Sequence, residues 1–227
     1  MRVSRLAMML ALLFSVFAGP AAAGESRIVA VNERVAVMPF IKGSKTDEAT
    51  RTLAVPMGRF RYDASVVRGD ADHALSETIQ ELLVARLGNR VVPLDRVWIT
   101  YEGLPIDPET ATPLEAALEL GLDLGVEYVV VGNVGRFRER VGTAYAVQEP
   151  ASVAFNLFLV GVESGRVVWH ASVVETQRSL SEDLFRLPRF FRRGAKWLSV
   201  GELARDGMKE ALKTFPLQAS PAHPGTP

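Results

Sequence analysis

The sequence predicts an α/β fold, a single domain in which a mixed β-sheet with an antiparallel hairpin packs against α-helices. Residues 126–134 are almost continuously apolar, which is typical of a central strand covered on both faces. Residues 150–162 and 166–174 are two β-rich runs around a short turn with a glycine, which predicts a hairpin. A serine or threonine followed three residues later by glutamate, the spacing of a helix-capping box, occurs at Thr112, Ser179 and Ser199.

The first predicted strand is Arg34–Phe40, which is short, apolar and β-branched, with Pro39 ending its ladder. The polar stretch 41–72 follows. A structureless loop of that length is uncommon in a compact domain, so we expect local structure there, including a strand at residues 59–62.

A helix should come next, because apolar and long side chains recur at helical spacing and Asp72 can serve as the N-terminal cap. The residues with this spacing are Leu75, Ile79, Leu82, Leu83 and Arg86. Residues 91–94 are apolar and predict a second short strand.

A further helix is predicted from Pro113 to Leu124 and is closed by Gly125. Residues 132–135 contain two glycines, but no helix start follows, so a phosphate-binding loop is not indicated. Glycine in a strand beside a close neighbour is the better explanation.

Each strand of the predicted hairpin has one apolar face, which we expect to belong to the core. These faces consist of Val153, Phe155, Leu157 and Leu159 on the first strand and Val167, Trp169, Ala171 and Val173 on the second. Helices are predicted after Ser179 and after Ser199, the latter running to about Phe215.

The N-terminus has the order of a cleavable secretory signal, with Arg2 and Arg5 before an apolar run and small residues at 21–23. The apolar run is shorter than the roughly 20 residues that span a bilayer. We therefore divide the chain into a signal peptide (1–23), a linker (24–33), an α/β domain (34–216) and a disordered tail (217–227). Cleavage after Ala23 predicts a periplasmic protein, with membrane association as an open alternative.

Charge and cysteine content limit the function classes. Removal of the signal leaves 24 basic against 26 acidic residues, and this balance disfavours nucleic acid as a partner. The chain has no cysteine, so disulfides and thiol chemistry are excluded.

In the order of its strands and turns, the chain resembles the bacterial envelope superfamily that includes CsgG, the amino-terminal domain of TolB and the lipoprotein activators of peptidoglycan synthases. The matching pieces are residues 35–40, 91–95, 120–133 and 164–169. Residues 193–204 also resemble uncharacterised lipoprotein-like members of this group. The resemblance implies a CsgG-like, anticodon-binding-domain-like α/β domain and a role in envelope assembly without catalysis. Gly24 stands where many relatives carry a lipidated cysteine, so the resemblance does not extend to a lipid anchor.

Residues capable of catalysis or metal binding do not form a recognisable pattern. The three histidines, His73, His170 and His223, have no metal-site or triad spacing. A cluster of carboxylates is formed in the sequence by Asp63, Asp70 and Asp72, but a solvated loop with one helix cap explains these residues as well as a catalytic or metal site does. We therefore expect no catalytic residue, no metal, no cofactor and no enzymatic activity.

The candidate binding segment is 185–197, in which basic and aromatic side chains alternate within a nearly neutral chain. Two interpretations stay open. The aromatic residues could pack a helix onto the sheet while the arginines are solvated, or the segment could bind a partner or an anionic membrane surface. The residues concerned are Phe185, Arg186, Arg189, Phe190, Phe191, Arg192, Arg193, Lys196 and Trp197.

Together these features predict an exported, non-enzymatic periplasmic binding or adaptor protein of cell-envelope assembly, an accessory of secretion or of peptidoglycan synthesis. Its partner would be an envelope protein, with the membrane surface or peptidoglycan as further options. The alternative is a peripheral membrane or lipid-binding protein that uses residues 185–197.

Overall fold

The structure, a computed structural model, describes residues 33–42, 53–55, 58–60, 67, 69–107, 111–142, 147–176 and 198–218. The predicted signal peptide, the predicted helix start at Ser179 and the binding segment 185–197 lie outside the described residues. Within the described residues, no helix is long and apolar enough to cross a membrane.

The described part of the chain is, as predicted, an α/β domain built on a mixed sheet; the strand order is β1-β5-β8-β9. Strand β1 (Val35–Val37) pairs in parallel with β5 (Tyr128–Arg138). Strand β8 (Ser152–Gly161) pairs antiparallel with β5 on one side and with β9 (Arg166–Thr176) on the other. The predicted hairpin is therefore confirmed, and Gly165 in its turn has a left-handed φ of 62°.

Beyond Pro39 the first strand resumes as β2 (Ile41–Lys42), which also pairs in parallel with β5. The break leaves the N–H of Phe40 outside the ladder. The buried hydroxyl of Ser76 accepts that N–H at 3.0 Å and donates to the carbonyl of Asp72 at 2.7 Å. The proline thus interrupts the pairing as predicted, and the hydroxyl of Ser76 on α1 supplies the acceptor that the Phe40 N–H lacks in the ladder.

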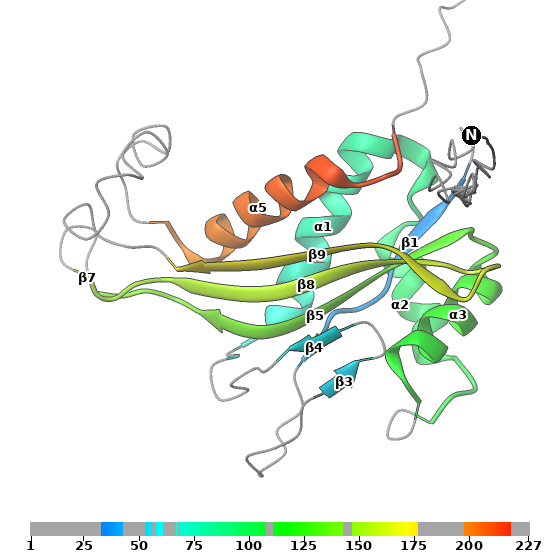
Figure 1. Cartoon of the computed structure of the whole chain (residues 1–227), viewed down its shortest axis with the longest axis horizontal. Coiled ribbons are helices and arrows are strands. Elements are labelled where there is room, and N and C mark those ends of the chain that lie inside the picture. Colours follow the sequence, from blue (N-terminus) through cyan, green and yellow to red (C-terminus); the bar gives the residue numbers. More distant parts are fainter. Residues whose placement is uncertain are drawn as a thin grey trace, which may run out of the picture.

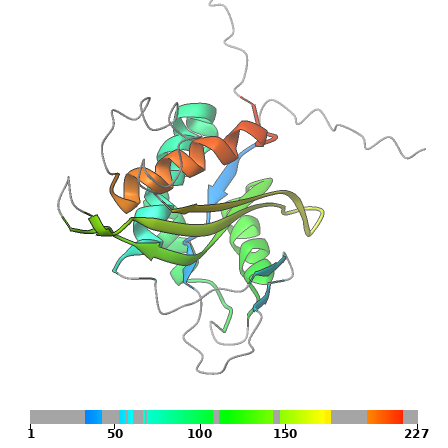
Figure 2. The ribbon, with the colours of Figure 1, turned by 60° about the vertical axis from the view of Figure 1, so that its left-hand side comes forward.

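Helices cover both faces of the sheet, as the apolar sequence of β5 predicted (Figures 1 and 2). Helices α1 (Ala71–Leu87) and α5 (Val200–Ala211) pack on one face, around Phe155, Leu157 and Leu159. Helices α2 (Leu94–Glu102) and α3 (Pro113–Leu124) pack on the other face, around Val129, Val131 and Phe158.

Both described capping boxes form. Thr112 and Glu115 exchange side-chain and backbone hydrogen bonds at the start of α3, and Gly125 ends this helix in the left-handed conformation. Ser199 and Glu202 do the same at the start of α5, which continues as the short 3-10 helix η4 (Leu212–Thr214) before Phe215.

Two predictions in the region of α1 and α2 were wrong. Asp70, not Asp72, occupies the N-cap position of α1, without a side-chain capping bond, and Asp72 lies in the first turn, where it pairs with Lys42 of β2. Residues 91–94 do not form a strand. After the 3-10 turn η2 (Gly88–Arg90), Val91 makes a single bridge to Val35, and α2 then begins at Leu94. Burial of Val97 against α3 outweighs the β-preference of the residues around it.

The second strand of the hairpin is less buried than predicted, because β9 lies at the edge of the described sheet. Val173 alone on this strand is buried. The register shifts by one residue between Leu159 and Val160, so Trp169 pairs with Leu159 but Val167 pairs with Val160. This bulge moves Val167 off the face predicted for it.

The polar connection holds one small ladder, β3 (Leu53–Val55) with β4 (Gly58–Phe60), which overlaps the strand predicted at 59–62. A second short ladder joins β6 (Val141–Gly142) to β7 (Val147–Glu149) beyond the end of β5.

The first and last described residues lie at the same end of the sheet. Arg34 accepts the N–H of Tyr128, where β5 begins, and the carbonyl of Leu217 accepts from Arg86 in the last turn of α1. Leu217 is buried and the carbonyl of Gln218 accepts from Arg90. Leu217 and Gln218, the first two residues of the predicted tail (217–227), therefore belong to the described fold.

Candidate functional site

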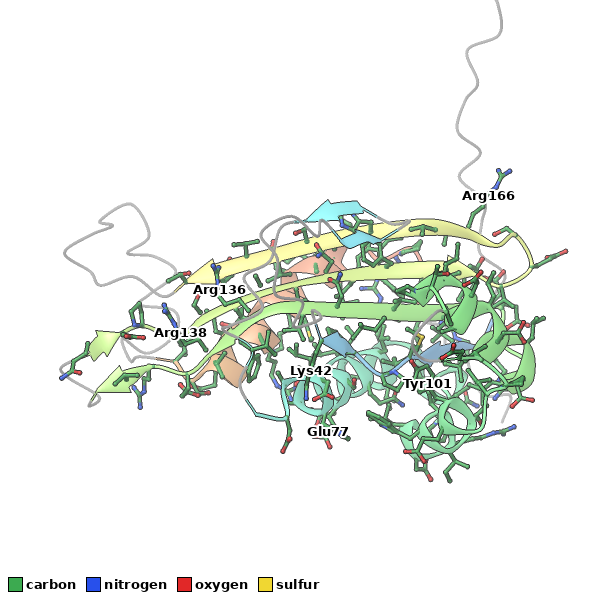
Figure 3. All side chains as sticks on the ribbon, turned by 90° about the horizontal axis from the view of Figure 1, so that it is seen from below. Lys42, Glu77, Tyr101, Arg136, Arg138 and Arg166 are labelled. Atoms are coloured by element: carbon green, nitrogen blue, oxygen red, sulfur yellow. The ribbon has the colours of Figure 1, made fainter. Side chains whose placement is uncertain are left out.

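The most distinctive site in the described residues lies beyond the helices, at the far end of β5. Gly135 has no partner in the ladder, because the register shifts between Val134 and Arg136. After this bulge Phe137 lies opposite Val153, on the face that carries α1 and α5. Arg136 and Arg138 point to the other face, and Figure 3 shows both at this end of the sheet.

A cavity of about 400 Å³ opens next to Phe137. Ala74 of α1, Phe137, Val141 and Val200 of α5 give it an apolar lining. Charged residues from three separate parts of the chain also line it, namely Asp70, Arg138, Glu139, Arg140 and Glu149. The starts of α1 and α5 thus meet the end of β5 around one hollow.

The α5 wall is held in place by Glu139. Its carboxylate oxygens accept the backbone N–H of Val200 at 3.2 and 3.3 Å, in addition to the capping box of Ser199 and Glu202. A carboxylate at this position is favoured by the helix dipole. Because Glu139 supplies that negative charge, the start of α5 is already satisfied within the chain.

One charge pair at the cavity, Arg138 with Glu149, is loose. Arg138 Nη1 lies 3.6 Å from Glu149 Oε2, and the two side chains are 35% and 57% exposed. An exposed pair at this separation contributes about 0–1 kcal/mol. Arg138 can therefore turn toward an incoming group at little cost.

Asp72 and Lys42 tie the start of α1 to the sheet, with 2.9 Å between Lys42 Nζ and Asp72 Oδ1. Burial raises the pKa of Asp72, but the hydrogen bond and positive charge of Lys42 and the N–H of His73 outweigh it, so the net pKa is lowered. Asp72 is thus ionised at neutral pH. The pair stabilises the fold above the ordinary pKa of aspartate, and this is lost as the pH falls through the lowered pKa.

The two described histidines each stack on a different ring. His73 is parallel to Trp98 at 4.5 Å, and His170 stacks on Phe158 at 4.8 Å, where burial lowers the pKa of its imidazole. In the described ranges no group of three His, Cys, Asp or Glu residues could hold a metal ion.

The segment 185–197 is outside the described residues, as are residues 177–184 before it; the described chain ends at Thr176 and resumes at Leu198. Thr176, at the end of β9, pairs with Ser152, which in turn pairs with Arg138, and the Thr176 and Ser152 hydroxyls are 2.8 Å apart. Leu198 precedes Val200, which lines the cavity. The C-terminal end of the predicted binding segment is therefore followed directly by residues that lie at the cavity.

Sequence reasoning did not find this cavity. The signals were Gly135 followed by alternating basic residues at 136, 138 and 140, which mark a bulge and a change of face. That the starts of α1 and α5 meet there depends on tertiary packing, which local sequence does not encode.

No protein-family model matches the sequence, and no curated protein matches it. Among solved structures, the chain is similar to the PelC dodecamer from Paraburkholderia phytofirmans, with 19% identity, a TM-score of 0.46 and coverage of 85% of this chain and 91% of that one. It is also similar to the C-terminal domain of LpoB from Salmonella enterica, with 13% identity, a TM-score of 0.38 and coverage of 66% and 86%. A third similar structure is lipoprotein GNA1162 from Neisseria meningitidis, with 16% identity, a TM-score of 0.37 and coverage of 72% and 98%.

Proposed function

We propose that this chain is an exported, non-enzymatic adaptor of the bacterial cell envelope that binds a protein partner at the cavity end of its sheet. One observation carries the proposal: the cavity beside Phe137 is lined by Val200, only three residues after the end of the basic and aromatic segment 185–197. Export and the envelope setting come from the signal-like N-terminus and from the sequence resemblance. An accessory role in secretion or in peptidoglycan synthesis is the finer form of the proposal.

The composition of the cavity supports protein binding. An apolar centre of Phe137, Val141 and Val200 within a charged rim is the usual make-up of an interface hot spot. About 400 Å³ is within the range of natural binding pockets, roughly 300–1,000 Å³. Segment 185–197, which ends three residues before Val200, contains five basic and four aromatic residues, and Arg, Trp and Phe are enriched at interfaces.

The test is affinity capture of the full mature chain from periplasmic extract. Val141→Glu places a negative charge in the lining of the cavity, where a bound partner would bury it. The side chain of Val141 is 47% exposed in the free protein, so the fold should tolerate the change. We expect at least a tenfold loss of the captured partner with this variant and with the triple change of Arg189, Arg192 and Arg193 to Ser. Ile99→Glu, on α2 and 74% exposed, is the matched control and should capture as well as wild type. Equal capture by all four proteins would exclude this end of the sheet as the binding site.

A membrane surface is the second candidate, favoured by the basic residues of segment 185–197 and by Arg136, Arg138 and Arg140 at and just after the end of β5, of which Figure 3 shows the first two. Each basic residue near an anionic bilayer contributes about 1 kcal/mol. Flotation with acidic lipid vesicles at low salt, lost in the triple arginine-to-serine variant, would support this candidate. No flotation of the wild-type protein would reject it.

A further inference from the structure

Strand β9 forms the outer edge of the sheet, and no described strand pairs with its free side. It is 11 residues long. Three of its valines are conspicuously exposed, Val167 at 36%, Val168 at 50% and Val174 at 67%. A long edge strand with exposed apolar side chains is a ready template for another strand.

The strand is held rigidly, so this template is preformed. It pairs with β8 along its whole length, from Arg166 to Thr176. Trp169 Nε1 donates to Thr214 Oγ1 at 3.1 Å and the indole packs edge-on against Phe215 at 5.0 Å. An incoming strand would therefore pay little for ordering β9.

Within its own sequence, β9 carries little of the usual protection of an edge. It contains no lysine and no proline, and its acidic and basic residues, Arg166 and Glu175, stand near its two ends. Its single bulge lies close to Val168, which leaves the stretch from Trp169 to Thr176 regular. Edges that must stay unpaired generally carry such protective residues along their length.

The sequence of β9 is complementary to itself in the antiparallel direction. Valine pairs stand at 167–168 and 173–174, preceded by Arg166 and followed by Glu175. In the antiparallel register centred on Ala171, Val168 of one copy lies opposite Val174 of the other, and the Arg166 end of one lies against the Glu175 end of the other. Parallel pairing would set like charges side by side, which is unfavourable. This symmetry selects a second copy of the chain over an unrelated strand.

We propose that two copies of this protein pair through the free edges of β9, antiparallel, about a two-fold axis near Ala171. The axis is perpendicular to the sheet, so the sheet becomes continuous across the dimer and both α5 helices stay on the same face. Pairing about Ala171 brings Val168 beside Val174 of the second copy. Arg166 lies at the opposite end of the sheet from Arg136 and Arg138 (Figure 3), and the cavity stays outside the interface.

Crosslinking tests the direction of pairing, because the chain has no cysteine of its own. Mature R166C and E175C, mixed and treated with a bis-maleimide of short spacer, should give a strong crosslinked dimer. Each variant alone should crosslink weakly, since identical ends lie far apart in an antiparallel pair. Crosslinking of each variant alone that is as strong as crosslinking in the mixture would overturn the antiparallel arrangement.

Mass in solution tests the interface itself. The wild-type protein should sediment at twice the chain mass, and Val174→Lys and Val168→Lys, both at exposed positions, should sediment as monomers. The control Ile99→Lys should remain a dimer. A wild-type monomer at every soluble concentration, or lysine variants that stay dimeric with unchanged urea midpoints, would exclude this interface. Partner capture by the Val174→Lys monomer reports separately on the proposed adaptor function.

Discussion

Ser76, on helix α1, accepts a backbone hydrogen bond from the first strand region. Pro39 ends the β1 ladder, and the N–H of Phe40 would be buried without an acceptor if the Ser76 hydroxyl did not lie 3.0 Å from it. A lost partner for a buried N–H costs more than a lost surface hydrogen bond, because the group keeps its desolvation penalty.

Replacing Ser76 with alanine should lower the free energy of unfolding by about 1–3 kcal/mol, the usual cost of an unsatisfied buried donor. Urea unfolding followed by circular dichroism measures this. Thr78→Ala is the matched control, because Thr78 donates only to the carbonyl of Ala74 within the same helix. We expect it to change stability by less than about 0.5 kcal/mol. Equal losses in the two variants would show that the Phe40 bond contributes nothing.

Glycine at position 132 was predicted to reflect a close neighbour, and the structure confirms this. A Cβ there would lie 2.4 Å from the ring of Phe40, which packs on the bare backbone of β5. The identity of that neighbour could not be predicted, because Phe40 reaches Gly132 only through the parallel pairing of β2 with β5.

At the scale of elements, α5 and β9 approach closely at Gly207. A Cβ on this glycine would lie 2.5 Å from Val173 Cγ1, and valine cannot easily rotate away because it is branched at Cβ. This contact brings the helix down onto the edge of the sheet.

Gly207→Ala should therefore destabilise the fold by about 1–2 kcal/mol, because overpacking of about 1–3 kcal/mol exceeds the gain of about 1 kcal/mol in helix propensity. Gly201→Ala in the first turn of the same helix is the control, with no atom nearer than 4.0 Å to its Cβ, and should be neutral or stabilising. Thermal unfolding compares the two. Adding Val173→Ala should recover part of the loss in a double-mutant cycle, and strict additivity would contradict the contact.

Elements with local signals were predictable and elements set by distant contacts were not. The capping boxes at Thr112 and Ser199 are contained in four consecutive residues, and both helices begin where expected. Helix α2 was missed because its β-branched and aromatic residues favour a strand until α3 buries Val97. The exposure of β9 was missed because strand sequence does not show which strand lies at an edge.

At the scale of the whole molecule, Arg86 joins the first helix to the end of the domain. Its guanidinium donates to the carbonyls of Leu212, Phe215 and Leu217 at 2.5, 3.1 and 3.0 Å. It also lies 5.9 Å from the centre of the Phe215 ring. From its spacing, Arg86 could be placed only on a helix face, because its three acceptors lie more than a hundred residues away.

Arg86→Met should cost about 2 kcal/mol of unfolding free energy, because hydrogen bonds to a charged group contribute about 1.5–3 kcal/mol and solvent replaces some of them. Arg86→Lys keeps the charge but not the planar fork, so an intermediate loss is expected. Hydrogen exchange should show that amides after Leu212 lose protection first. Uniform loss of protection through the sheet would contradict a local role for this residue.

The candidate site was predictable only in part. The sequence drew attention to the basic and aromatic character of residues 185–197, and that prediction stays open. The cavity beside Phe137 depends on where the starts of α1 and α5 fall relative to β5, which no local pattern contains.

Arg34 and Leu217 are held where β5 begins, whereas the cavity lies where β5 ends, about 35 Å away for a strand of 11 residues. The molecule therefore has a polarity. Anything attached to the start or the end of the described domain, whether a tag, a fused domain or a support for a binding measurement, is held at one pole and presents the cavity at the other.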